Sequence, residues 1–552
     1  MAIDRISRRA VMASGTLGGA ALFMSGGLFA AETVTLTAPV ATANGRVRGM
    51  RGGGISRFLG IPYGDDTSKA RFQPPRPAPG WTGVRDCFAP GAQAPQGIIN
   101  LPGIGSGGGI TGPLPPAAGI VMAVARSTSV RDPESENCLF LNIFTPEAST
   151  TRKRPVMVWL HGGAFAMGQG LNPMTDGTAL ARDGDLVMVS LNHRLNALAY
   201  LYLGDLHPDF TDSGNSGQLD IVLALQWVRD NITAFGGDPD NVTLFGQSGG
   251  GAKVSALLGT VPAKGLFHKA IAQSGATPML VERADAAAIA EQTLAKLGVA
   301  RADVHQLQTM DVRKVIAAAS AVKLPGGAGL SSRTLAPVVD GRSVPAHPFL
   351  PKASALSRDV PLMIGTTKDE ATLFLAMDPA FGKMSADDAR TRFNAMLGPR
   401  GEAAFDVYRS AQPDDPPTYW VTSLMTDMML RTNAIIEADR KAEQNAAPVY
   451  MYRVDYEPRV ADRALRSPHG AEVPLMFGNF IPPEFIGSGP ELAALSKQTM
   501  QSWINFAHSG DPSRKGLVWP RYDTRQRQTV IIDVPMRVAA DPNRPTREFW
   551  AA

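Results

Sequence analysis

Seven short apolar runs, separated by longer amphipathic segments, organise the sequence from about residue 140 onward. The runs lie at residues 156–160, 186–191, 242–245, 270–273, 362–365, 449–454 and 529–532. Apolar residues at helical spacing fill the segments between them, as at 218–232 and 284–297. Strands that alternate with helices in this way predict a mostly parallel central sheet with helices on both faces. The predicted fold class is therefore α/β.

The remaining segments suggest how the chain is organised around this sheet. Short β-like runs at 33–36, 45–48 and 56–60 precede it. Residues 97–119 are nearly all Gly, Pro, Ile, Leu and Ala, and we interpret them as a long loop. Between residues 277 and 361 the strand pattern fades, which predicts a helical insertion that walls the functional site. Because no Gly/Ser or charged linker divides residues 32–552, we expect them to form one domain.

The N-terminus has the three parts of an export signal. Residues 5–9 carry three arginines, an uncharged stretch rich in Ala, Gly and Leu follows, and small residues end it near position 31. The paired Arg8 and Arg9 resemble a twin-arginine signal. Residues 1–31 therefore predict bacterial export to the periplasm or the cell exterior. An uncleaved membrane anchor is the alternative, although the glycines of the stretch weaken it as a span.

Composition excludes several classes of function. The formal net charge is +4, of which residues 1–31 contribute +2, and no Lys/Arg stripe points to nucleic acid. Two cysteines, Cys87 and Cys138, rule out a disulfide framework and a cysteine-rich zinc site, and whether they pair is open. A GxGxxG match at 103–108 lacks the strand and helix of a dinucleotide site. No HExxH or clustered His/Asp pattern indicates a catalytic metal, so we expect neither cofactor nor metal.

The sequence GQSGG at 246–250 is the strongest chemical signal. The run 242–245 leads directly into it and a helical segment follows, which is the context of a nucleophile elbow. The small residues Gly246 and Gly250 allow the backbone to pass closely on both sides of Ser248. We therefore predict that Ser248 is a catalytic nucleophile.

A nucleophilic serine needs a general base and donors for an oxyanion. The HGGAF sequence at 161–165 follows the run 156–160, where backbone N–H groups can point at a developing alkoxide. Of the downstream histidines, His469 lies in a loop after the run 449–454 and fits the base better than His508. Asp369 and Glu370 both follow the run 362–365, and spacing alone leaves the choice of acid open.

These motifs resemble the type-B carboxylesterase and cholinesterase family over nearly the whole chain after residue 31. The similarity is carried by FLGIPYG at 58–64, SENCLFLNIFTP at 135–146, HGGAF at 161–165, NSGQLDIVLALQWVRDNITAFGGDP at 215–239, VTLFGQSGG at 242–250, GTTKDEATLF at 365–374 and HGAEVPLMFG at 469–478. The resemblance implies an α/β-hydrolase fold with a triad of Ser248, Glu370 and His469. It implies oxyanion donors at Gly163, Ala164 and Gly249, and it places Ser274 beside the triad.

Two departures from the family pattern affect the expected site. The residue before the nucleophile is usually Glu and is Gln247 here, so we expect His469 to protonate less readily than in relatives. Ala94 stands where the family often has the disulfide partner of Cys138, so a disulfide would have to use Cys87 instead.

Together these observations predict a serine carboxylic-ester hydrolase that acts through an acyl-enzyme on small to medium, uncharged, fairly hydrophobic esters. A transacylase with the same triad is an alternative, as is a non-catalytic cholinesterase-like binding protein. The expected partner is a small-molecule ester, with no nucleic acid and no stable membrane insertion after signal removal. The sequence leaves the oligomeric state open.

Overall fold

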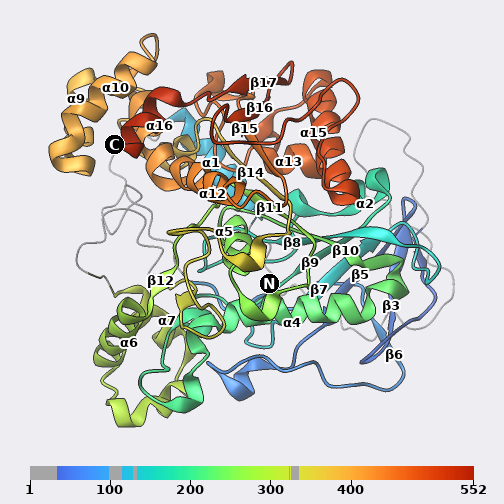
Figure 1. Ribbon diagram of the computed structural model, residues 1–552. Coiled ribbons are helices and arrows are strands. Elements are labelled where there is room, and N and C mark those ends of the chain that lie inside the picture. The colour runs from blue at the N-terminus through green and yellow to red at the C-terminus, as the bar shows by residue number, and fades with distance from the viewer. Residues whose placement is uncertain (1–33, 98–114, 129–132, 323, 325–334) are drawn as a thin grey trace, which may run out of the picture.

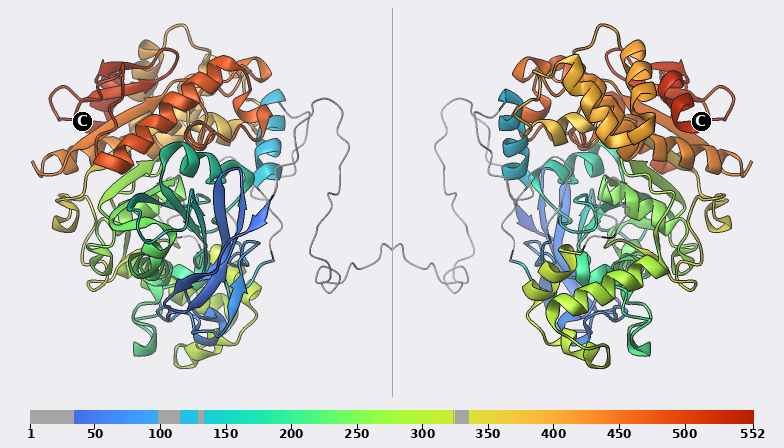
Figure 2. Two further views of the ribbon diagram at one scale, coloured as in Figure 1. Left: turned by 90° about the vertical axis from the view of Figure 1, so that its right-hand side faces the viewer. Right: turned by 90° about the vertical axis from the view of Figure 1, so that its left-hand side faces the viewer.

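The predicted parallel sheet is present at the centre of the molecule (Figure 1). The computed structural model describes residues 34–97, 115–128, 133–322, 324 and 335–552. Within these ranges a 12-stranded sheet has the strand order β1-β4-β5-β7-β9-β8-β10-β11-β14-β15-β16-β17. Figure 2 shows the N-terminal strands in blue toward one end of the molecule and the C-terminal elements in orange and red toward the other.

The seven apolar runs all become neighbouring strands of this sheet. They are β9 (Val187–Leu191), β8 (Arg154–Leu160), β10 (Gly237–Gln247), β11 (Lys269–Gln273), β14 (Leu362–Thr367), β15 (Val449–Val454) and β16 (Gln528–Ile532). Every adjacent pair among them is parallel. Their carboxyl ends therefore meet at one edge of the sheet, where α/β folds bind ligands.

Antiparallel strands complete both ends of the sheet. At one end lie β1 (Thr35–Leu36), β4 (Met50–Gly52), β5 (Ile55–Pro62) and β7 (Phe140–Thr145), and at the other β17 (Arg537–Ala540). Two small sheets lie apart from the main one: β2 (Val40–Thr42) with β3 (Gly45–Arg48) and β6 (Val84–Asp86), and β12 (Val281–Glu282) with β13 (Val338–Val339).

Helices cover both faces of the sheet, as predicted. Alternate strand residues divide between two apolar clusters, because successive side chains of a strand point to opposite faces. Met157, Trp159 and Phe245 pack with α13 (Glu472–Phe477) and α15 (Pro490–Ser509). Residues of the other face pack with α4 (Ser216–Asn231), α5 (Gly249–Leu257) and α12 (Thr432–Ala442).

Two helical insertions interrupt the alternation, one of which the sequence predicted. The expected helices between residues 277 and 361 are α6 (Arg283–Leu297) and α7 (Val312–Ser320), joined by η7 (Arg301–Gln308). A second group lies between β14 and β15 and was missed: α8 (Ala371–Leu375), α9 (Ala386–Leu397), α10 (Gly401–Ala411) and α11 (Pro417–Thr426), which η11 (Asp427–Arg431) joins to α12. Other helices are α2 (Thr178–Gly184), α3 (Asn196–Tyr200), α14 (Pro483–Ile486) and α16 (Arg544–Ala551).

The structure corrects one predicted segment. Residues 116–119, the last part of the segment expected to be a loop, are helical. They open α1, which spans Pro116–Thr128 and buries Ala117, Ala118 and Ile120. Proline is tolerated in the first turn of a helix, so the proline-rich composition did not exclude it. Residues 98–114 lie outside the described ranges, as does the predicted export signal at 1–31.

The two cysteines are separate buried thiols in the structure. Burial raises the pKa of Cys87 to about 12 and keeps the pKa of Cys138 well above that of a free thiol, so both stay protonated at neutral pH. They pack as apolar side chains in the same cluster as Val156 and Leu160. Separately, among the described helices none has both the length and the apolar character required to cross a bilayer.

A buried ion pair fastens α4 to the end of β9. Asp220 on α4 accepts hydrogen bonds from Nε and Nη2 of Arg194 at 2.9 and 2.6 Å, and from the Arg194 backbone N–H at 2.9 Å. The side chains of Arg194 and Asp220 are 2% and 0% exposed. Two charges buried this deeply stabilise each other only as a pair.

We therefore expect Asp220→Asn to lower the free energy of unfolding by about 3–5 kcal/mol, because it leaves Arg194 charged, buried and without a carboxylate. The matched control is Asp230→Asn on the same helix, where Arg229 and Asp230 form a pair that is 55% and 50% exposed. Asp230→Asn should lower the free energy of unfolding by less than about 1 kcal/mol. Urea-induced unfolding of the two variants measures the difference, and equal destabilisation would contradict this reading.

Candidate active site

Ser248 occupies a sharp turn between β10 and α5. Its backbone has φ 58° and ψ −125°, a left-handed conformation that is strained for any residue with a Cβ. The Ser248 N–H donates to the Gln273 carbonyl at 2.8 Å, which anchors the turn to β11. A Cβ added to Gly250 would lie 2.0 Å from the Leu160 carbonyl oxygen, so only glycine fits there. The geometry is that of the predicted nucleophile elbow.

The loop after β8 lies directly against this elbow. Gly163 and Ala164 have φ values of 91° and 52°, so both residues are in the left-handed region. A Cβ on Gly249 would lie 2.1 Å from the Ala164 carbonyl oxygen, which shows how closely the loop approaches the start of α5. The N–H groups of Gly163 and Ala164 donate to no described residue. Gly249 opens α5, where N–H groups lack intrahelical partners.

A histidine and a carboxylate meet at the same edge of the sheet. His469, in the loop between β15 and α13, lies with Nδ1 2.6 Å from Oε2 of Glu370, which follows β14. The second Glu370 oxygen accepts the Thr367 N–H at 2.8 Å, and the carboxylate is 0% exposed. The structure thus distinguishes the two acids that spacing could not. Asp369 lies near the Ser467 N–H instead, and burial raises its pKa to about 6.

The remaining ring nitrogen of His469 faces Gln247. The amide Nε2 of Gln247 lies 3.2 Å from Nε2 of His469, so the amide donates to the ring and the ring proton resides on Nδ1, toward Glu370. Among the described residues, no hydrogen bond joins Ser248 Oγ to this nitrogen. This contact with Gln247 therefore favours the neutral form of the His469 ring, whose proton lies on Nδ1.

A second buried carboxylate, which sequence reasoning missed, lies close to this pair. Glu472 accepts a hydrogen bond from Ser274 Oγ at 3.1 Å, and its own pKa is raised to about 7 by burial and by the charge of Glu370. Burial of the His469 ring opposes its protonation, but the charge and hydrogen bond of Glu370, with the charge of Glu472, outweigh it. The pKa of His469 consequently lies above its ordinary value. The sequence signal for Glu472 was its position three residues after His469.

A buried lysine lies beneath the loop at 161–165 and was also missed. Lys253 on α5 is 0% exposed, and its Nζ donates to the carbonyl oxygens of Ala164 at 2.9 Å and His161 at 3.1 Å. Its ammonium group also lies 5.5 Å from the centre of the Phe165 ring. Burial lowers the pKa of Lys253 to about 7. The sequence signal was a single lysine in an otherwise apolar run five residues after Ser248.

The other downstream histidines have different partners. His508 Nε2 lies 2.9 Å from the Gly184 carbonyl oxygen. His347 pairs with Glu282 at 2.8 Å, and His305 pairs with Asp209 at 3.1 Å. Only His469 is joined to residues of the elbow and to the acid that follows β14.

Known proteins match this architecture over almost its whole length. The model of the carboxylesterase family matches residues 37–550. The para-nitrobenzyl esterase of Bacillus subtilis is 33% identical over 92% of this chain and 97% of its own, and the phenmedipham hydrolase of Pseudarthrobacter oxydans is 32% identical over 92% and 98%. The solved carboxylesterase Est55 of Geobacillus stearothermophilus, at 34% identity, covers 93% of this chain and 99% of its own with a TM-score of 0.77.

These similarities confirm the resemblance and the fold predicted from the sequence. A solved para-nitrobenzyl esterase structure, 32% identical, also superposes with a TM-score of 0.75 over 92% of the chain. Because both the family model and the relatives extend across the sheet, the elbow and the C-terminal helices, the match is not limited to one motif. The chain belongs to the carboxylesterase family, has the α/β-hydrolase fold and is a carboxylic-ester hydrolase.

Proposed function

We propose that the chain hydrolyses esters through an acyl-enzyme on Ser248, with His469 as general base and Glu370 as the acid that orients it. The observation that carries this proposal is the 2.6 Å contact between His469 Nδ1 and Glu370 Oε2, formed beside the elbow. All three residues follow carboxyl ends of parallel strands of one sheet, β10, β14 and β15, so the sheet itself brings them to the same edge.

In the first half of the reaction, Ser248 Oγ attacks the ester carbonyl and its proton passes to Nε2 of His469. The Gln247 amide occupies that nitrogen in the structure, so it has to give way to the serine hydroxyl. Glu370 stabilises the imidazolium that forms. The alcohol then leaves with the proton, and in the second half water attacks the acyl-enzyme and releases the acid.

We assign the N–H groups of Gly163, Ala164 and Gly249 as donors to the tetrahedral oxyanion. Lys253 acts as a positioning residue for them, since its Nζ binds the carbonyl of Ala164 from beneath the loop. Together with the bond to the His161 carbonyl, that bond holds the loop on both sides of the N–H groups of Gly163 and Ala164. A donor that is fixed before the reaction stabilises an oxyanion without the cost of reorganisation.

The proposed substrates are small to medium, uncharged, fairly hydrophobic esters. Aromatic side chains near the reacting groups support this choice. The Phe374 ring lies 5.0 Å from the His469 ring, and Phe165 belongs to the loop that carries the proposed donors. Neither ring carries a charge or a hydrogen-bond donor to pair with an anionic acyl group.

Reaction with a fluorophosphonate probe tests the nucleophile. Full-length protein should be labelled once, and Ser248→Ala should lose the label together with at least about 10⁴-fold of kcat, because the acyl-enzyme cannot form. Absence of labelling in the wild type would favour the non-catalytic alternative. If the probe labels the wild type but ester products form only when a competing alcohol is present, the transacylase is favoured.

Exchange of Gln247 for Glu tests the environment of His469. A carboxylate against Nε2 favours the charged imidazolium, so the pKa of His469 rises. Because the base must be neutral, the acid limb of kcat/KM should move to higher pH in Gln247→Glu. The charge-matched control Gln526→Glu, at an exposed position, should leave the profile in place. A shift to lower pH, or the same shift in both variants, would refute this role.

The role of Lys253 is tested by Lys253→Met, which keeps the length of the side chain and removes the donor. We expect kcat to fall about 10- to 100-fold while KM changes little, because displaced donors weaken transition-state binding. Lys441 is also 0% exposed and donates to the Arg358 carbonyl and the Gln444 side chain, on α12 rather than beneath the loop. Lys441→Met should therefore reduce stability without the loss of kcat, and equal kcat losses in both variants would refute the positioning role.

A further inference from the structure

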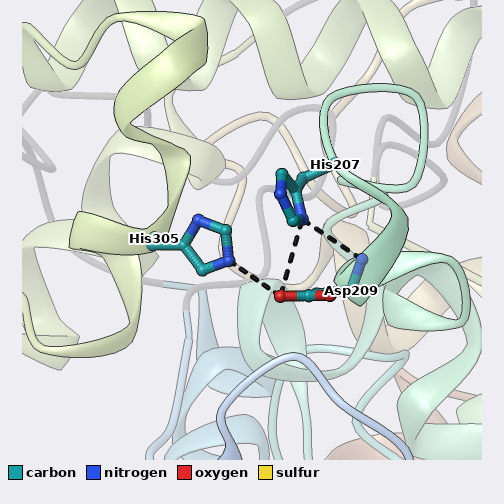
Figure 3. A group of neighbouring side chains, drawn as sticks. All are labelled: His207, Asp209 and His305. Carbon is teal, nitrogen blue, oxygen red and sulfur yellow. Dashed lines mark hydrogen bonds and ion pairs between the residues drawn. The ribbon is translucent and has the colours of Figure 1, made fainter.

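Three metal-ligating side chains converge outside the esterase site. His207 and Asp209 lie at η3 (Pro208–Phe210), and His305 lies in η7 of the first helical insertion (Figure 3). Asp209 Oδ2 is 3.1 Å from Nε2 of His305 and 3.6 Å from Nδ1 of His207. One ligand atom from each residue lies within 4.8 Å of the other two. Asp209 and His305 are 96 positions apart in the chain.

We propose that His207, Asp209 and His305 bind one divalent transition-metal ion of the Zn²⁺ type. Two imidazole nitrogens with one carboxylate oxygen suit Zn²⁺, Ni²⁺ or Cu²⁺, whereas Mg²⁺ and Ca²⁺ prefer sets made of oxygen alone. The carboxylate also supplies negative charge against the ion. Water completes the coordination, since the three side chains are 39%, 55% and 42% exposed.

Both ring nitrogens that would bind the metal already face Asp209. Nδ1 of His207 accepts the Asp209 N–H at 3.2 Å, so this nitrogen carries no proton and faces the carboxylate. Nε2 of His305 also points at Asp209. In the metal-bound form the ion replaces two hydrogen bonds, the one between His305 and Asp209 and the one that Nδ1 of His207 accepts from the Asp209 N–H. The ring proton of each histidine then lies on its other nitrogen.

Apolar packing holds the two rings close together without an ion. Their centres are 4.3 Å apart, and the Phe210 ring lies 5.0 Å from His305 and 6.2 Å from His207. Phe210 is itself fully buried and packs against Phe72. Ligands that are held near their bound positions lose little conformational entropy on binding. This packing distinguishes the cluster from a solvated His–Asp pair.

The position of the ion would give it a structural role. It would link η3, which precedes α4, to η7, which lies between α6 and α7. Figure 1 shows α6 and α7 at the lower left, away from the second helical group around α9 and α10. The carbonyls of Leu307 and Met310, at and just after the end of η7, accept hydrogen bonds from Arg71. The bound ion would therefore fasten the insertion to the loops of the sheet beside an existing anchor.

Calorimetric titration of the EDTA-treated full-length chain with ZnCl₂ tests the proposal. We expect one saturable site per chain, a higher midpoint of thermal unfolding with Zn²⁺, and no saturable binding of Mg²⁺. His305→Ala and Asp209→Asn should weaken Zn²⁺ binding at least about 10-fold, because each removes a ligand. Retained ester hydrolysis in both variants would establish that they fold.

His347→Ala provides the matched control. His347 pairs with Glu282 at 2.8 Å, but within the described residues it belongs to no group of three ligands. Its removal should leave Zn²⁺ binding unchanged. Absence of saturable Zn²⁺ binding by the wild type, or equal affinity in wild type and both ligand variants, would overturn the proposal. Because the readout is metal binding, it is independent of whether Ser248 is the nucleophile.

Discussion

The close contact of backbones between the ends of β8 and β10 is the constraint on which the site depends. Gly250 lies against the Leu160 carbonyl and Gly249 against Ala164, at distances that exclude any Cβ. This contact forces Ser248 into its left-handed conformation and places the start of α5 beside the loop at 161–165. Since β14 and β15 run parallel to β10 in the same sheet, Glu370 and His469 come to the same edge.

Charge is distributed unevenly around that edge. Glu370 and Glu472 are buried on the side of His469, and Lys253 is buried on the side of the loop at 161–165. Gln247 is neutral, and its amide lies against Nε2 of His469. The expectation that His469 protonates less readily than in relatives stays a prediction, and the two glutamates raise the pKa of His469 above its ordinary value.

The errors of sequence reasoning have a common physical origin. A helix that covers the sheet and a helix in an insertion have the same apolar period, so the second group at 371–426 was not separated from the regular alternation. The composition of residues 116–119 suggested a loop, yet burial of Ala117 and Ala118 stabilises α1. In both cases tertiary packing determined the structure of the segment, and the local residue pattern did not predict it. Two assignments remain predictions: residues 32–552 as one domain, and residues 1–31 as an export signal.

The sequence by itself determined the order of the strands' apolar runs, the serine between glycines, the loop of small residues after β8 and the family to which the chain belongs. These features are local, because each depends on residue types at short spacing. Only the tertiary structure placed Glu370 rather than Asp369 against His469, brought Lys253 beneath the loop and Glu472 near His469, and gathered His207, Asp209 and His305. Such pairings depend on distances between segments far apart in the chain, which no spacing along the sequence encodes.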